Sequence, residues 1–254
     1  MQLNDQMSAV VTGGGSGLGL ATVEKLVAKG VHVVVADLAD KKEELAQKFG
    51  DKVTYLKADV TQAEQVEAAV AAAVAVAPLR VLVNCAGFGG AIRVVDRDGN
   101  PGELEKFESI IRVNIIGSYN ALRFAAAAMA KNEVINGERG ACVLTASVAA
   151  YEGQIGQIAY AAGKAGIVGM TLVAARDLAS KFIRVNTIAP GLFDTPLLAR
   201  LPQEVRDSLG AMTPNPARLG YPSEFAELAV QMAENAYLNG ETIRLDGAIR
   251  MAPR

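Results

Sequence analysis

Tyr160 and Lys164 are the residues whose types and spacing point most directly to chemistry. They stand four positions apart in a stretch that is predicted to be helical, which places both side chains on one face, with their Cβ atoms about 6 Å apart. A phenol has a pKa of about 10, and a nearby ammonium stabilises the phenolate and lowers that pKa towards neutrality. The pair is therefore suited to moving a proton on or off an alcohol or carbonyl oxygen.

Ser147 supplies a third polar group near the same place. It follows the apolar run 141–145, which is predicted to be a buried strand, on the side where ligands bind in an open α/β sheet. Its hydroxyl is suited to holding a substrate oxygen while Tyr160 takes or returns the proton. Each signal alone has an ordinary alternative, because Tyr-x-x-x-Lys pairs arise by chance on helices and a serine after a strand commonly caps the next turn.

A glycine-rich turn near the start of the chain predicts a phosphate-binding site. It lies between the first predicted strand and the first predicted helix, with the spacing Gly13-x-x-x-Gly17-x-Gly19. Glycines permit the backbone to approach a pyrophosphate closely, and the free N–H groups and dipole of the helix favour its negative charge. The candidate cofactor residues here are Thr12, Gly13, Ser16, Gly17, Leu18 and Gly19. The alternative is a turn of this composition that binds no ligand.

Asp37, at the end of the second predicted strand, indicates which dinucleotide binds. A carboxylate at this place accepts hydrogen bonds from the ribose hydroxyls of NAD and repels the 2′-phosphate of NADP. An NADP site is expected to carry Lys or Arg nearby, whereas Ser16 and Leu38 are uncharged. The sequence therefore predicts NAD as the cofactor, with Asp37 and Leu38 beside the ribose. The alternative is a surface aspartate that caps the next helix.

Short β-branched runs alternate with Ala-rich helical stretches. This pattern predicts one α/β domain over residues 1–254, a Rossmann-type doubly wound parallel sheet of about seven strands with helices on both faces. The predicted strands are 9–12, 32–36, 53–57, 81–85, 141–145, 184–188 and 242–245, and the predicted helices lie near 18–29, 40–48, 62–77, 105–131, 157–179 and 223–234. Two loops, 93–102 and 192–221, are expected to be functional, the second as a substrate lid.

Composition narrows the class of protein. Charged residues make up 20% of the 254 residues and the net charge is −2, which argues against an electrostatic nucleic-acid binder. No apolar run reaches the roughly 18 residues of a membrane span, so no membrane partner is expected. With one histidine, and two cysteines (Cys85 and Cys142) in apolar runs, neither a metal site nor a disulfide is expected. The first residues resemble neither a secretory signal nor a transit peptide, which predicts a cytoplasmic location, or the mitochondrial matrix if a leader has been removed.

Together these motifs resemble the short-chain dehydrogenase/reductase family over essentially the whole chain, although Cys85 stands where many members carry Asn. The resemblance implies that Tyr160 is the acid–base, that Lys164 lowers its pKa and binds the nicotinamide ribose, and that Ser147 positions the substrate. It also implies that Asn114 holds a water in a proton relay with Lys164. The other cofactor contacts that it implies are Asp59 and Val60 at the adenine, Asn84, Cys85, Ala86 and Gly87 beside the cofactor, and Pro190, Gly191, Leu192, Phe193 and Thr195 around the nicotinamide carboxamide.

Longer stretches, at 146–154, 189–193, 195–198 and 239–251, are similar to members of this family that interconvert 3-hydroxyacyl-CoA and 3-oxoacyl-CoA. The expected activity is therefore NAD-dependent oxidation of an (S)-3-hydroxyacyl-CoA, with a small acyl-CoA molecule as substrate. The alternatives are the same chemistry on a steroid, a branched hydroxyacyl-CoA or another secondary alcohol, and a non-catalytic NAD-binding scaffold or RNA-processing partner. The family also implies a homotetramer paired through the long helices 105–131 and 157–179, with residues 249–251 adding a second interface.

Overall fold

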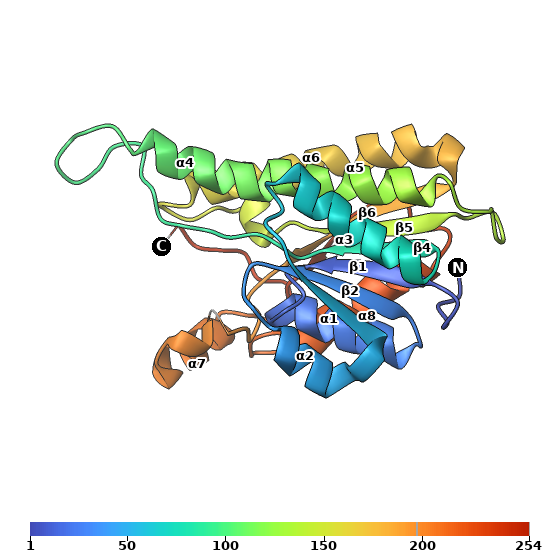
Figure 1. Ribbon diagram of the computed structural model, residues 1–254. Helices are drawn as coiled ribbons and strands as arrows, with labels where there is room; N and C mark the ends of the chain where they lie inside the picture. Colours follow the sequence, from blue (N-terminus) through green and yellow to red (C-terminus); the bar gives the residue numbers. More distant parts are fainter. Residues whose placement is uncertain (197, 254) are drawn as a thin grey trace.

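Seven parallel strands form the sheet that positions the site, in the order β3-β2-β1-β4-β5-β6-β7 (Figure 1). The computed structural model describes residues 1–196 and 198–253. The strands are β1 (Ser8–Thr12), β2 (His32–Asp37), β3 (Val53–Lys57), β4 (Leu79–Asn84), β5 (Gly140–Thr145), β6 (Ile183–Pro190) and β7 (Thr242–Leu245). β1, β4, β5 and β6 are buried throughout, because helices cover both faces of the sheet. The predicted fold class is confirmed, and each predicted strand end lies within two residues of the observed one.

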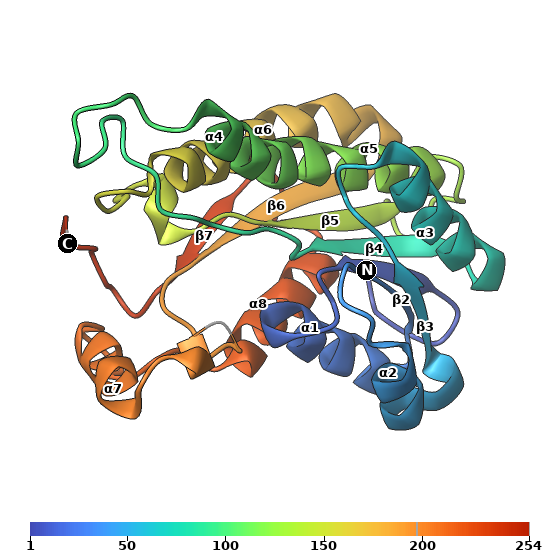
Figure 2. The same cartoon turned by 60° about the vertical axis from the view of Figure 1, so that its left-hand side comes forward.

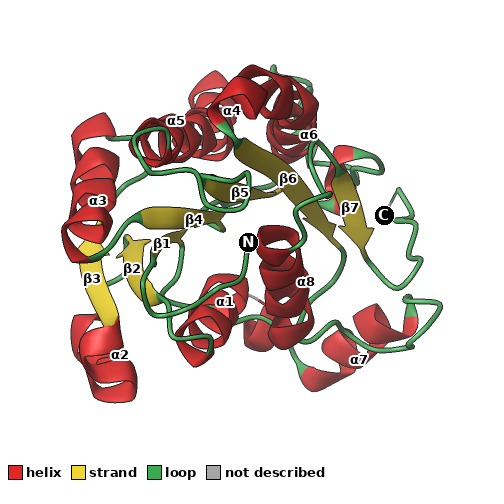
Figure 3. Cartoon of the chain, turned by 90° about the vertical axis from the view of Figure 1, so that its right-hand side faces the viewer, coloured by secondary structure: helices red, strands yellow, loops and turns green. Residues whose placement is uncertain are grey.

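The helices form a layer on each face of the sheet (Figure 3). One layer contains α1 (Gly17–Ala28), α2 (Lys42–Phe49) and α8 (Pro222–Glu234), and the other contains α3 (Ala63–Val76), α4 (Leu104–Ile111), α5 (Ser118–Met129) and α6 (Ile158–Leu178). Successive side chains of a strand point to opposite faces. Val11 therefore packs in the core under α1 and α8, while its neighbour Val10 packs in the core under α3, α5 and α6.

α4 and α5 form one continuous rod that is not one regular helix. Between them, Arg112–Gly117 makes a π-helical turn. The predicted helix 105–131 is therefore three segments in succession, from Leu104 to Met129. Turns of this kind inside α-helices are frequent at functional sites, and this one contains the candidate site residue Asn114. A one-residue widening of the helix leaves little trace in a hydrophobic pattern, so the sequence did not indicate it.

α6 carries Tyr160 and Lys164 and is a long, apolar helix. By length and composition alone, the segment Ile158–Lys181 is long and apolar enough to cross a membrane, with a mean hydropathy of 1.5. Ala159, Gly163, Ile167, Thr171 and Ala175 are buried, and their spacing of four residues marks one stripe along the helix. Ile167, Thr171 and Ala175 pack against the sheet, whereas Ala159 and Gly163 face α4 and the π-helical turn, which is the pattern of a core helix in a layered domain.

Three expectations about the connecting segments are wrong in detail. The stretch 192–221 is not a loop throughout, because it contains α7 (Gln203–Ala211), which stands apart from the two helical layers (Figure 2). Cys85 does not lie inside a buried strand, since β4 ends at Asn84 and the thiol is half-buried. Ile249 is buried within its own chain against Gly191, so its side chain is not available to the second interface that is predicted for residues 249–251. Leu197, another expected lid residue, lies outside the described residues.

Candidate active site

Two adjoining cavities open at the carboxyl ends of the central strands. One, of about 600 Å³, lies beside the glycine-rich turn, and the other, of about 770 Å³, contains Ser147, Tyr160 and Lys164. They share a wall made of Leu18, Cys85, Gly87, Phe88 and Thr195. The sheet order changes direction between β1 and β4, and open α/β sheets bind ligands in the crevice at such a switch point. The smaller cavity is called the dinucleotide cavity below, and the larger one the reaction cavity.

The glycine-rich turn is closely packed at the positions where its glycines stand. Gly13 has a φ of +65°, and a Cβ on it would lie 2.8 Å from the backbone nitrogen of Ala86. A Cβ on Gly19 would lie 2.1 Å from the Gly13 carbonyl oxygen. α1 begins at Gly17, and the Ser16 side chain does not cap it. The first N–H groups of α1 are therefore available to an anion in the dinucleotide cavity, which fits a pyrophosphate.

Asp37 lies at the far end of the dinucleotide cavity, together with Leu38. One carboxylate oxygen accepts from the Gly15 N–H at 2.9 Å and the other from the Ala39 N–H at 3.0 Å. The carboxylate is thereby fixed, and each oxygen keeps a lone pair for a ribose hydroxyl. A cation near Asp37, Lys41, was not identified from the sequence. Its side chain lies near Gly15, but its ammonium is paired with Glu44 at 2.6 Å.

The rest of the dinucleotide cavity is lined by residues that the sequence had assigned to the cofactor. Asp59, Val60, Ala86 and Gly87 contribute to its walls. Thr12 and Asn84 do not line it, but they hold the turn in place. The Thr12 hydroxyl donates to the Asn84 side-chain oxygen at 2.7 Å and accepts from the Ala86 N–H at 3.2 Å. Ala36, Ala58, Val113 and Pro196 complete the walls and were not expected from the sequence.

A buried chain of hydrogen bonds continues from Asn84 to the π-helical turn. The Asn84 amide donates to the Ser118 hydroxyl at 2.9 Å, and that hydroxyl donates to the Asn114 carbonyl oxygen at 2.6 Å. The Asn114 side-chain amide in turn donates to the carbonyl oxygens of Phe88 and Ile110, at 2.7 and 3.0 Å. These contacts fix the side chain of Asn114 beneath the floor of the site.

The oxygen atom of the Asn114 side chain is buried and accepts no hydrogen bond from the described residues. A Cβ placed on Gly87 would lie 2.7 Å from this oxygen and 3.0 Å from the Lys164 Nζ atom. The glycine therefore leaves a gap where the two polar atoms meet. A polar atom between them would be held from both sides, as a proton relay between Asn114 and Lys164 requires.

Ser147, Tyr160 and Lys164 all line the reaction cavity. Ser147 also caps the short turn that follows it, because its Oγ atom accepts from the Ala149 N–H at 3.1 Å. Capping, the ordinary alternative for this residue, is thus compatible with a place at the cavity wall. The Lys164 Nζ atom donates to the Thr145 carbonyl at 2.8 Å and lies 5.7 Å from the centre of the Tyr160 ring. β5 and α6 together therefore hold the three side chains around one space.

Burial dominates the protonation of this site when no ligand is present. It raises the pKa of Tyr160 above its ordinary value, and a hydrogen bond with Ser147 opposes that rise only in part. It also lowers the pKa of Lys164 to about 8. The predicted lowering of the Tyr160 pKa, by Lys164 together with a positive nicotinamide ring, refers to the enzyme with its cofactor bound and stays a prediction. The positive charge of an oxidised nicotinamide ring is the further contribution that would favour the phenolate.

The reaction cavity is also lined by Pro190, Gly191, Leu192, Phe193 and Thr195, as expected of a wall around the nicotinamide end. Phe193 is mainly a core residue, since it packs edge-on against Phe225 with 6.5 Å between ring centres. Leu198 lines the cavity, whereas Leu201 is exposed and does not. The loop 93–102 projects away from the sheet (Figure 1), and of its residues only Arg93 lines the cavity.

Several residues of the reaction cavity were not identified as site residues from the sequence. Gln154, Ile155 and Gln157 come from the segment between Ser147 and α6, and Met251 comes from the end of the chain. The spacing of these residues carries no signal, because contacts across the fold bring them to the cavity. The only hint was that Gln154 and Met251 fall within the stretches similar to acyl-CoA enzymes.

A cavity with a phosphate-binding turn, joined to a second cavity with a partly buried Tyr and a buried Lys and Ser, defines an oxidoreductase that uses a nicotinamide cofactor. The family model described as short chain dehydrogenase matches residues 7–206. The chain belongs to this family, which acts on small-molecule substrates.

The relatives are similar over nearly their whole length. The chain is 49% identical to 3-hydroxyacyl-CoA dehydrogenase type-2 of Drosophila melanogaster over 96% of this chain and 98% of that protein. It is 50% identical to the Homo sapiens protein of the same name, over 96% and 95%. The crystal structure of 3-hydroxyacyl-CoA dehydrogenase type-2 from Mycobacterium avium superposes with a TM-score of 0.95 at 49% identity, covering 98% of each chain.

Proposed function

We propose that this enzyme is an NAD-dependent dehydrogenase that interconverts an (S)-3-hydroxyacyl-CoA and the corresponding 3-oxoacyl-CoA. The observation that carries the proposal is the identity of about half of all residues, over nearly the whole chain, to proteins named for that activity. The reaction cavity supports it, because it places a proton-transferring Tyr beside apolar walls that suit an acyl chain.

In this proposal the residues of the reaction cavity divide the proton chemistry between them. A nicotinamide ring held beside Pro190, Gly191 and Thr195 would supply the acceptor for the hydride of the carbon that bears the hydroxyl. The Ser147 hydroxyl holds the substrate oxygen, and the Tyr160 phenolate takes the hydroxyl proton as the carbonyl forms. Lys164 stabilises the phenolate and passes the proton on towards Asn114 through the gap beside Gly87. The reverse reaction returns the proton from Tyr160 to the oxygen.

NAD, and not NADP, is the proposed cofactor. Asp37 presents a fixed carboxylate to the adenosine end of the dinucleotide cavity. A 2′-phosphate at that place would meet this negative charge, and the cation nearest to it, Lys41, is paired with Glu44. Both features favour a ribose with free hydroxyls.

Replacing Asp37 tests this cofactor preference. Asp37→Ala removes the repulsion and the ribose contacts together, so we expect the ratio of kcat/KM with NADH to that with NADPH to fall by about tenfold or more. Lys41→Gln serves as a control for general disturbance of the loop, because its charge is already paired. A ratio that is the same in Asp37→Ala and in the wild type would remove Asp37 from the ribose site.

The substrate class is tested with a panel of ketones and NADH. Acetoacetyl-CoA, a 17-oxosteroid and a small 2-oxo acid are reduced in parallel, and the oxidation of NADH is followed by absorbance. The proposal predicts the highest kcat/KM for acetoacetyl-CoA. Faster turnover of the steroid or the oxo acid would keep the reaction type and overturn the substrate class, whereas binding of NADH without any turnover would favour a non-catalytic role.

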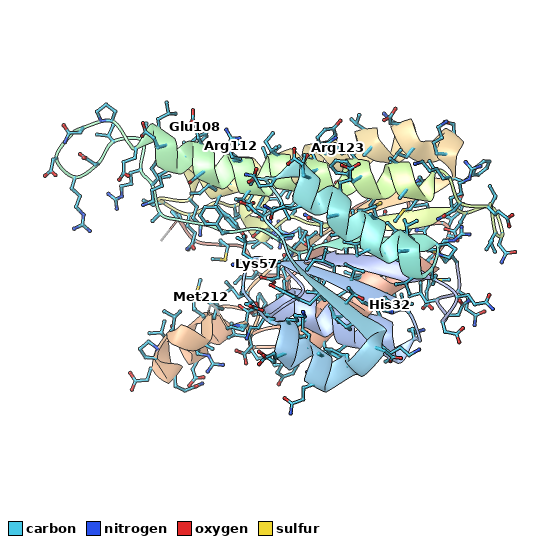
Figure 4. All side chains as sticks on the ribbon, viewed as in Figure 1. His32, Lys57, Glu108, Arg112, Arg123 and Met212 are labelled. Carbon is cyan, nitrogen blue, oxygen red and sulfur yellow. The ribbon has the colours of Figure 1, made fainter. Side chains whose placement is uncertain are left out.

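We further propose that the enzyme is a homotetramer that pairs through α5 and α6. The outer side of the α4–α5 rod and of α6 carries exposed apolar side chains, namely Leu104, Ile116, Tyr119, Leu172 and Val173. The same rod also presents Glu108, Arg112 and Arg123 (Figure 4). A second subunit would cover this mixed surface. The small residues Ala125, Ala126 and Gly163 do not contribute to it, because they are buried inside the chain.

A further inference from the structure

Residues 246–253, called the tail below, return from β7 to the reaction cavity. The Ile155 N–H donates to the Pro253 carbonyl at 2.9 Å, and the Gln154 amide donates to the Ala252 carbonyl at 3.1 Å. Met251 lies between these contacts and the turn after β7, and it lines the cavity that also contains Tyr160. Figures 1 and 2 both show the end of the chain on the same side of the sheet as α7.

A cluster of ion pairs fixes the start of the tail. Arg244, on β7, donates from its two terminal nitrogens to the two carboxylate oxygens of Glu152 at 2.7 and 2.8 Å. Its Nε atom donates to Asp246 at 2.7 Å, and a terminal nitrogen also donates to the Ile249 carbonyl at 3.1 Å. The side chains of Arg244 and Glu152 are 21% and 26% exposed, so water screens the pair only in part. This cluster is called the Arg244 clamp below.

The clamp joins the tail to the segment that carries the reacting groups. Glu152 lies between Ser147 and Tyr160 in the sequence, in the turn that leads into α6. The pKa of its carboxyl is lowered, chiefly by the hydrogen bonds from Arg244, so the pair remains charged at neutral pH. A two-pronged contact between a guanidinium and a carboxylate fixes orientation as well as distance. The tail is therefore held against the wall of the site and not merely near it.

The turn after β7, where the tail begins, also contacts the segment that is proposed as a substrate lid. The Asn215 N–H donates to the Gly247 carbonyl at 3.3 Å, and a Cβ on Gly247 would lie 2.3 Å from a methyl carbon of Thr213. On its other side, the Gly191 N–H donates to the Leu245 carbonyl at 2.9 Å. The segments 152–155, 191 and 213–215 thus meet at one short turn that the clamp fixes, and Gln154, Ile155 and Gly191 among them line the reaction cavity.

We propose that the tail is a specificity-determining wall of the reaction cavity, with Met251 as its contact to the substrate and with Glu152 and Arg244 as positioning residues. The substrate class used here rests on the proposed function. Met251 limits the room for the acyl chain, and the clamp holds it there. Loss of the Met251 side chain and loss of the clamp therefore both shift the preference towards longer acyl chains. Neither change alters the dinucleotide cavity.

The experiment measures kcat/KM for acetoacetyl-CoA and for 3-oxooctanoyl-CoA, together with the Kd of NADH, in Met251→Ala, Glu152→Gln and Arg244→Lys. We expect both Met251→Ala and Glu152→Gln to change the ratio of the two kcat/KM values by about tenfold in favour of the longer chain, with little change in the Kd of NADH. Arg244→Lys keeps the positive charge, so we expect this variant to retain part of the wild-type selectivity that Glu152→Gln loses. Lys29→Gln, which breaks the ion pair with Glu234 on the opposite side of the fold, is the matched control.

Combining the changes tests whether the clamp acts through the tail. In the double variant Glu152→Gln/Met251→Ala, the second substitution should add little to the shift in selectivity that the first produces. Additive shifts, or a Glu152→Gln variant that loses kcat equally for both substrates, would show a general structural role and overturn the proposal. An unchanged ratio in Met251→Ala would remove the tail from the substrate site.

A fluorescent reporter separates failure of this inference from failure of the proposed function. The chain contains no tryptophan, so Met251→Trp introduces a single indole beside the nicotinamide end of the site. NADH should quench its emission strongly by energy transfer, and adding Glu152→Gln should weaken that quenching. This result does not depend on any acyl-CoA substrate. Equal quenching with and without Glu152 would contradict the clamp even if acetoacetyl-CoA proves to be a substrate.

Discussion

Burial of the charged Lys164 side chain lowers the stability of the fold. Its ammonium is buried and donates to the Thr145 carbonyl, and burial lowers its pKa from 10.5 to about 8. A shift of this size corresponds to about 3 kcal/mol by which the folded chain disfavours the charged form. The proposed chemistry requires that charge, because it stabilises the Tyr160 phenolate. Stability and activity are therefore opposed at this position.

Lys164→Met is predicted to stabilise the enzyme without cofactor while abolishing turnover. Near neutral pH the variant avoids the buried charge, a gain of up to about 3 kcal/mol that the lost hydrogen bond reduces by about 1 kcal/mol. Between pH 8 and 10.5 the unfolded wild-type chain binds more protons than the folded one. Its stability therefore rises with pH across that window, and the advantage of the variant shrinks. Urea unfolding near pH 7 and near pH 10.5 measures this, and a variant less stable than the wild type at both would contradict it.

Tyr160→Phe is predicted to lower kcat by at least about 100-fold, because it removes the group that exchanges the proton with substrate. The ring stays in place, so the affinity for NADH should remain close to that of the wild type. Stopped-flow turnover and a fluorescence titration with NADH measure the two quantities. Substantial residual turnover would mean that another group is the base.

At the scale of elements, the glycine-rich turn and α1 act as one unit. A Cβ on Gly19 would lie 2.1 Å from the Gly13 carbonyl, which belongs to the backbone and has no flexible side chain to move aside. Gly19→Ala must therefore shift either the turn or the helix. We expect the Kd of NADH to rise at least about tenfold and the unfolding free energy to fall by about 1–3 kcal/mol. Calorimetric titration and urea unfolding test this, and near-native values in both would show that the turn is not rigid.

The elements themselves were largely predictable from the sequence, for a physical reason. Buried parallel strands such as β1 and β5 are almost continuously apolar, and their ends are marked by polar or glycine residues, so local composition locates them. The glycine turn, Asp37, Ser147, Tyr160 and Lys164 follow from position relative to those strand ends. The structure brings all of them to the two cavities.

Other features depend on contacts that local patterns do not record. The π-helical turn at Asn114 changes the helix by one residue without changing its apolar face. α7 has only one buried residue, so little periodicity marks it within the lid. Met251 lines the cavity in a tail that is tied to distant parts of the chain, by Gln154 and Ile155 and by the pair of Arg244 with Glu152, 92 residues away. The raised pKa of Tyr160 likewise follows from burial, which the spacing of Tyr160 and Lys164 does not reveal.

At the scale of the whole molecule, the two sides of α6 have different roles. Its buried stripe faces the interior of the fold, and its outer side faces away from it. The stripe supports the site, whereas the outer side leaves Val173 66% exposed. An apolar side chain so exposed on a long helix is suited to a subunit interface. Association through this side would place α6, and with it Tyr160 and Lys164, next to the interface.

Val173→Glu is predicted to dissociate the proposed tetramer, because it places a charge in the contact between the long helices. Val74→Glu on α3 is the matched control, since Val74 is also an exposed valine, at 49%. Size-exclusion chromatography with light scattering should show smaller particles for Val173→Glu alone. A wild-type monomer, or a tetramer that survives in Val173→Glu, would remove this interface.

The most direct test of the proposed function is the rate of acetoacetyl-CoA reduction by the wild-type enzyme with NADH and, separately, with NADPH. Rapid oxidation of NADH, and much slower oxidation of NADPH, is the result that the two cavities and Asp37 predict. Clear binding of NADH without any turnover of acetoacetyl-CoA would contradict the acyl-CoA assignment, although the fold and the family would stand.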